Sequence, residues 1–107
     1  MLDVHISDSY DTATRTDPVC AFDFEVHRSF FANLVQGQSA FPLLCRMKDY
    51  YADCSYSVAD AVMLATEIER LLPTVDQRTP HFSLLQQLRR ACDSATNAKQ
   101  TIFVFCD

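Results

Sequence analysis

The sequence contains a single glycine, Gly37, among its 107 residues, where an average composition would give about seven. Glycine adopts positive φ more easily than any other residue, so two-residue hairpin turns should be scarce in this chain. The phosphate-binding loops of nucleotide-binding folds need at least two glycines, which excludes those folds. The shortage of glycine therefore favours a helix-rich domain with few tight turns.

Length and composition are typical of one globular domain, which we expect to span residues 1–107. Hydrophobic residues make up 49% and charged residues 21% of the chain, as in folded rather than disordered proteins. The net charge of −5 argues against binding to a nucleic-acid backbone. No apolar run approaches the roughly 18 residues of a membrane-spanning helix, so we expect no membrane association.

The five cysteines are dispersed, and no two of them have a Cys-x-x-Cys spacing. The first residues, Met1 to His5, lack the basic and apolar segments of a signal peptide. We therefore expect a cytoplasmic protein whose thiols are reduced and mostly packed on apolar faces. The cysteines are Cys20, Cys45, Cys54, Cys92 and Cys106.

Both ends of the chain have the patterns of β-strands. Residues 2–7 alternate between apolar and polar side chains, which is typical of a half-buried strand. Residues 101–106 are β-branched or aromatic on both faces, which predicts a covered strand in the middle of a sheet. A weaker alternation predicts a short strand over 19–24, and the polar residues 8–18 predict a flexible loop.

Four apolar stripes with helical spacing lie between these strands. They cover residues 26–35, 43–54, 58–72 and 84–95. Asp23, Ser57 and Thr79 have the positions of N-caps, and Gly37 has the position of a C-cap for the first helix. The pattern predicts an α+β fold of two layers, in which a small sheet formed by the chain ends packs against about four helices.

The titratable side chains supply the first candidates for chemistry. Asp49 and Asp53 would share one face of a helix, where paired carboxylates can do acid–base work, hold a metal or form a solvated surface. Glu67 is expected on the wet side of its helix. The three histidines, His5, His27 and His81, lack a spacing for metal ligands, and we expect them at the surface, with no metal or cofactor in the protein.

Aromatic residues and one thiol supply the remaining candidates. Phe30, Phe31, Tyr50, Tyr51 and Tyr56 are too numerous for one small core, and an exposed aromatic patch would be a protein-binding site. Cys54 precedes a helix whose N-terminal dipole would lower the pKa of a thiol, which makes it the candidate nucleophile. A buried cysteine without chemistry is the alternative interpretation.

One long portion of the chain, residues 22–107, resembles a group of small uncharacterised bacterial proteins. The resemblance rests on Asp49-Tyr50-Tyr51-Ala52-Asp53-Cys54-Ser55-Tyr56-Ser57, on Glu67-Ile68-Glu69, on Leu85-Gln86-Gln87-Leu88 with Ala91-Cys92, and on the final Cys106-Asp107. It implies a bacterial, cytoplasmic protein of one domain. It implies no activity, because the group has none assigned.

Two functional hypotheses follow from these observations. The first is a non-enzymatic interaction module, immunity-like or regulatory, whose acidic and aromatic surface binds a protein partner or a second copy of the chain. Its site would comprise Asp49, Tyr50, Asp53, Cys54 and Tyr56. The alternative is a small enzyme that depends on a thiol or a carboxylate, or a ligand-binding domain. We favour the interaction module, because no catalytic motif occurs in the sequence.

Overall fold

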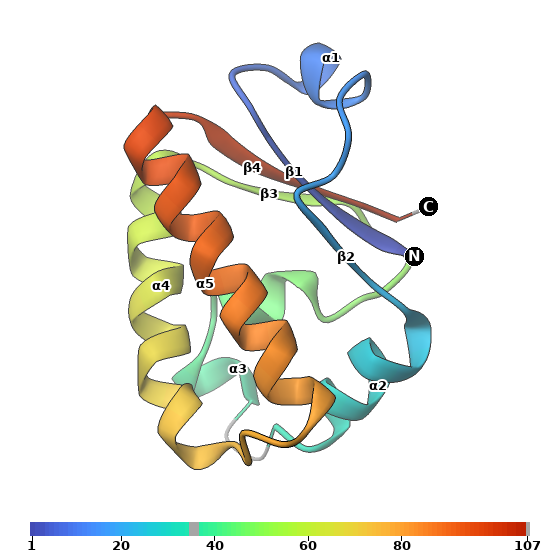
Figure 1. Ribbon diagram of the computed structural model, residues 1–107, viewed down its shortest axis with the longest axis vertical. Helices are drawn as coiled ribbons and strands as arrows, with labels where there is room; N and C mark the ends of the chain where they lie inside the picture. The colour runs from blue at the N-terminus through green and yellow to red at the C-terminus, as the bar shows by residue number, and fades with distance from the viewer. Residues whose placement is uncertain (35–36, 107) are drawn as a thin grey trace.

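Four antiparallel strands form one sheet in the computed structural model, which describes residues 1–34 and 37–106. The two terminal strands are its centre, pairing from Leu2 opposite Cys106 to Ser7 opposite Thr101 (Figure 1). The chain ends therefore form the sheet, as predicted. The strands are β1 (Leu2–Ser7), β2 (Cys20–Phe22), β3 (Cys54–Tyr56) and β4 (Thr101–Cys106), in the order β2-β1-β4-β3.

Helices cover one face of this sheet, which confirms the predicted two-layer α+β architecture (Figure 1). The two long helices pack side by side, and Leu64, Ile68, Leu85 and Leu88 are almost fully buried between them and the sheet. The helices are α1 (Tyr10–Ala13), α2 (Phe24–Ala32), α3 (Gly37–Ala40), α4 (Val58–Leu71) and α5 (Pro80–Ala98), with 3-10 turns η1 (Leu44–Met47) and η2 (Leu72–Thr74).

The three predicted N-caps are confirmed. The side chain of Asp23 accepts a hydrogen bond from Val26 N, which lies in the first turn of α2. Ser57 does the same for α4, and Thr79 does so for α5. Each cap satisfies an amide that the helix itself leaves without a partner. The starts of α2, α4 and α5 could therefore be predicted from single residues.

The role predicted for Gly37 is wrong. Helix α2 ends at Ala32, and its C-cap is Asn33, whose side-chain amide donates to Ser29 O at 2.8 Å. Gly37 instead begins α3, with the positive φ of 56° that glycine adopts most easily. Lys99 has the same φ of 56° at the end of α5, although it is not a glycine. Val35, the last residue of the predicted stripe, lies outside the described residues.

The helix predicted over residues 43–54 is also wrong. The segment makes only the 3-10 turn η1, after which the side chain of Asp49 accepts from Tyr51 N at 2.9 Å in a tight turn. The chain then extends as β3, whose residues Cys54 to Tyr56 pair with Val104 to Ile102. Pairing with the edge of β4 overrides a local apolar spacing that fits a helix.

The last strand was predicted to be covered on both faces, but its second face is only partly covered. Strand β4 does lie in the middle of the sheet, between β1 and β3, as predicted. Its outward residues Phe103 and Phe105 are half-buried and contact the ring of Tyr10, with centroids 6.1 and 5.4 Å away. Tyr10 belongs to α1, so the segment 8–18 contains a helical turn where we expected only loop.

Glu67 is buried, contrary to the expectation of a solvated residue. Its two carboxylate oxygens accept hydrogen bonds from Leu43 N at 3.1 Å and Leu44 N at 3.0 Å. The hydroxyl of Tyr56 donates to Leu43 O at 2.7 Å. Both backbone groups of Leu43 are therefore held by side chains from other elements, which positions η1 beneath α4.

Replacement of Glu67 should be costly for stability. We expect Glu67→Ala to lower the free energy of unfolding by about 3 kcal/mol, because two buried amides lose a charged acceptor. Urea denaturation followed by circular dichroism measures this change. Glu69→Ala is the matched control on the exposed side of α4, and we expect its effect to stay below about 1 kcal/mol. Equal effects of the two variants would contradict the structural role of Glu67.

Candidate functional site

A cluster of rings lies where α2 meets the turn after η1. We call it the aromatic surface, and it comprises Phe24, His27, Phe31, Tyr50 and Tyr51. Phe24 meets Tyr50 edge to face with centroids 5.2 Å apart, and Tyr50 meets Tyr51 in the same way at 5.3 Å. His27 contacts both Phe31 and Tyr50, at 4.8 and 5.3 Å. Such contacts hold the rings in defined orientations.

Two rings of the aromatic surface remain open to solvent. Tyr51 is 73% exposed and Phe24 is 39% exposed, although each could contribute a large apolar area to a core. Between α2 and the turn lies a hollow of about 410 Å³. Arg28, Lys48 and Asp49 also line it. The aromatic surface is therefore concave, with charged side chains around exposed rings.

A buried histidine positions this surface. His27 is only 3% exposed, and its Nε2 donates to Met47 O at 2.7 Å. This bond ties α2 to the end of η1 and so sets the place of the following turn. The expectation of a surface histidine is wrong here, because the ring lies under Tyr50 and Phe31.

Tyr50 lies near groups that can carry negative charge, and the basic residues Arg28 and Lys48 line the same hollow. Loss of solvation raises the pKa of its hydroxyl, and Cys106, Tyr51, Asp23 and Asp3 raise it further in that order. A tyrosine hydroxyl is protonated at neutral pH, so that of Tyr50 can donate a hydrogen bond to a ligand.

The structure separates the five site residues that the sequence suggested. Asp49 and Tyr50 line the hollow, but Asp53 accepts a hydrogen bond from Cys106 N at 2.8 Å, at the end of the sheet. The two aspartates therefore do not share a helix face. Tyr56 is fully buried under η1, so it belongs to the core and not to an exposed surface.

Cys54 does not have the environment of an activated thiol. It lies half-buried on β3, and burial raises the pKa of its thiol to about 11. Arg46 and a hydrogen bond with Tyr56 act in the opposite direction, but the loss of solvation exceeds them. Burial also raises the pKa of Cys20 to about 11 and that of Cys92 to about 12. The helix dipole that we expected to activate Cys54 is outweighed by burial.

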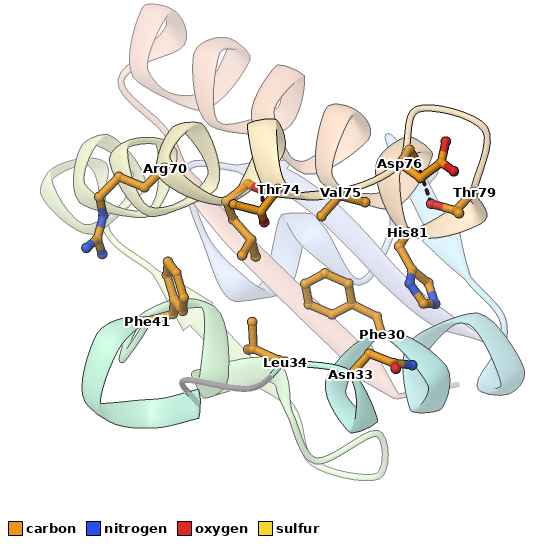
Figure 2. A pocket seen from close by; sticks show the side chains of 11 residues that line it. Phe30, Asn33, Leu34, Phe41, Arg70, Thr74, Val75, Asp76, Thr79 and His81 are labelled. Carbon is orange, nitrogen blue, oxygen red and sulfur yellow. Dashed lines mark hydrogen bonds between the residues drawn. The ribbon is translucent and has the colours of Figure 1, made fainter.

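A second hollow is larger and was not predicted. It has a volume of about 740 Å³ and lies between α2, Phe41, the end of α4 and the start of α5 (Figure 2). Its residues come from segments far apart in the sequence, so no local sequence motif predicted this cavity. The lining comprises Phe30, Asn33, Leu34, Phe41, Arg70, Leu71, Thr74, Val75, Asp76, Thr79 and His81.

One side-chain pair beside this cavity resembles a nucleophile and its base. Ser29 Oγ and His81 Nε2 are 2.9 Å apart, which is a hydrogen-bonding distance. His81 lines the cavity and is half-buried, whereas Ser29 is not among the described residues that line it. Because only His81 of the pair lines the cavity, the bond fits a structural link between α2 and α5.

The remaining titratable groups form no metal site in the part of the chain that the structure describes. His5 is 6% exposed and its Nδ1 has no hydrogen-bond partner among the described residues. Its ring packs on Phe105 with centroids 5.2 Å apart. Over the same residues, no helix is both long enough and apolar enough to cross a membrane.

No protein-family model, curated protein or solved structure matches this chain. The candidate sites therefore stand on their geometry alone. The aromatic surface combines exposed rings with charge, and the larger cavity combines apolar walls with separate polar groups.

The environment of Cys54 leads to a measurable expectation. With a pKa of about 11, the thiol should react with iodoacetamide at pH 7.5 at least about tenfold more slowly than in the urea-unfolded chain. Its rate should keep rising up to pH 10, because deprotonation is incomplete below the pKa. Peptide-resolved mass spectrometry measures both effects. A fast reaction that is independent of pH above 7 would contradict them and would favour a thiol enzyme.

Proposed function

We propose that this protein is a non-enzymatic interaction module that binds a protein partner through the aromatic surface. The observation that carries the proposal is the exposure of Tyr51, at 73%, beside a hollow of about 410 Å³. Tyrosine is enriched among residues that dominate binding energy, particularly where a ring lies beside a pocket. Ring contacts with Phe24 and Tyr50 limit the conformational entropy that Tyr51 would lose on binding.

The acidic groups near Tyr50 support a partner that carries an apolar anchor and basic residues, while Arg28 and Lys48, which also line the hollow, would contact an acidic group of that partner. Asp3 and Asp23 lie close enough to act on Tyr50, and Asp49 lines the hollow. The net charge of −5 would also speed the encounter with a basic protein. Such a partner would suit an immunity-like or regulatory role. We propose a bacterial cytoplasm as the location on the basis of the sequence resemblance and the reduced thiols. A second copy of the chain is the alternative partner for this surface.

The enzymatic alternative has weaker support. The high pKa of Cys54 disfavours a thiol nucleophile, and separate hydrogen bonds keep Asp49 and Asp53 from acting as a pair. Ligand binding has support of its own from the larger cavity.

Photo-crosslinking tests the proposed surface. With p-benzoylphenylalanine in place of Tyr51, we expect adducts of one defined mass after irradiation in the source cells. The matched control places the same residue at Met63, which is 60% exposed on α4. An adduct of twice the chain mass would identify the second copy as partner.

Two substitutions then measure the contribution of the surface. We expect Tyr51→Ala and Asp49→Lys each to reduce recovery of the crosslinked partner in a pull-down by at least about tenfold. Met63→Ala should leave recovery unchanged. Equal crosslinking at positions 51 and 63, or undiminished recovery with both substitutions, would refute this surface assignment.

A further inference from the structure

The larger cavity has the size and walls of a small-molecule site. Its volume of about 740 Å³ falls within the range of about 300–1,000 Å³ that is usual for ligand pockets. Phe30 and Phe41 line it and are 3% and 5% exposed, so each ring is held firmly in the core and presents only a small part of its surface to the cavity. Leu34 and Val75 add aliphatic surface. These walls suit an apolar body that includes a ring.

Apart from Thr74, the polar groups of the cavity lie toward its two ends. Figure 2 shows Arg70 and Phe41 at one end, and Asn33, Asp76 and His81 at the other. A ligand that spans the cavity would therefore meet a different chemistry at each end.

Arg70 supplies a cation that has no carboxylate partner among the described residues. Its guanidinium lies over the ring of Phe41 at 5.0 Å, and its Nη2 donates to Ala40 O at 2.7 Å. Among the described residues, no carboxylate lies within 4.0 Å of it, whereas Arg46, Arg78 and Arg89 each have one. A guanidinium held in this way retains donors in the planar arrangement that matches a carboxylate.

The opposite end offers no comparable charge. The carboxylate of Asp76 accepts hydrogen bonds from Arg78 Nε at 3.2 Å and Nη2 at 3.0 Å, and the same arginine lowers its pKa. Asp76 is therefore already neutralised and is a poor site for a ligand ammonium group. Asn33 and His81 remain as groups that can hydrogen-bond a neutral polar substituent.

We infer that this cavity is a second binding site, separate from the aromatic surface, which takes a small carboxylate with an apolar, ring-bearing body. The carboxylate lies against Arg70, and the ring lies between Phe41 and Phe30. The site binds an anion and not a zwitterion, because its only uncompensated charge among the described residues is that of Arg70.

Displacement of a fluorescent probe tests this inference on the unmodified protein. The probe is 1-anilinonaphthalene-8-sulfonate, an aromatic anion whose fluorescence rises in apolar surroundings. We expect it to bind with 1:1 stoichiometry and to be displaced by 4-phenylbutyrate. The neutral analogue 4-phenylbutanol should displace it at least about tenfold more weakly, since it lacks the charge that Arg70 recognises. Failure of the probe to bind, or equal displacement by the two compounds, would overturn the inference.

Matched variants then place the site. We expect Arg70→Gln to weaken 4-phenylbutyrate binding by at least about tenfold, and Arg90→Gln, which changes an exposed arginine of α5 outside the cavity, to leave it unchanged. Thr74→Trp, which fills the cavity, should abolish binding. Tyr51→Ala should have no effect, and an effect equal to that of Arg70→Gln would move the site to the aromatic surface and refute the inference.

Circular dichroism confirms that each variant is folded before binding is measured. Arg70→Lys keeps the charge but loses the planar arrangement of donors, and it should bind 4-phenylbutyrate more tightly than Arg70→Gln. If Arg70→Gln does not fold, the comparison of 4-phenylbutyrate with 4-phenylbutanol still decides the inference, because it needs only the unmodified protein.

Discussion

The two hydrogen bonds from the Leu43 and Leu44 amides to the carboxylate of Glu67 position the middle of this fold. The segment from 41 to 53 has little regular structure of its own, so its path depends on side chains that satisfy its backbone. Tyr56 holds the carbonyl of Leu43, and Arg46 lies over the ring of Tyr56 while pairing with Asp60 at 3.0 Å. A buried carboxylate is costly unless hydrogen-bonded, and here its acceptor capacity is used to order a loop.

Both candidate sites lie on this ordered segment, at its two ends. Phe41 precedes the pair of amides and forms a wall of the larger cavity, next to Arg70, which lies one turn after Glu67 on α4. Tyr50 and Tyr51 follow η1, and the bond from His27 to Met47 O fixes where they emerge. The placement of this irregular segment therefore sets one wall of the larger cavity and the turn that lines the smaller hollow.

The sequence predicted those features that depend on local pattern. Strands β1 and β4 followed from alternation and from β-branched content, and the three N-caps followed from Asp23, Ser57 and Thr79. It did not predict β3, because a spacing that fits a helix was overridden by pairing with β4. The burial of Glu67 and His27 was equally hidden, since each is stabilised by backbone groups more than 19 residues away. Of the residues that the sequence suggested for a site or an aromatic patch, Phe31, Asp49, Tyr50 and Tyr51 line the smaller hollow, whereas Asp53, Cys54 and Tyr56 lie elsewhere.

The central pairing of β1 with β4 joins residues about as far apart as this chain allows. Of the two edge strands, β2 pairs with β1, which is made early in synthesis, whereas β3 pairs only with β4. During translation, helices α4 and α5 would exist before the strand that completes the sheet beneath them, with Leu64, Leu85 and Leu88 still exposed. The sheet therefore cannot be completed until residues 101–106 are available, and contacts of such long sequence separation make that closure slow relative to helix formation.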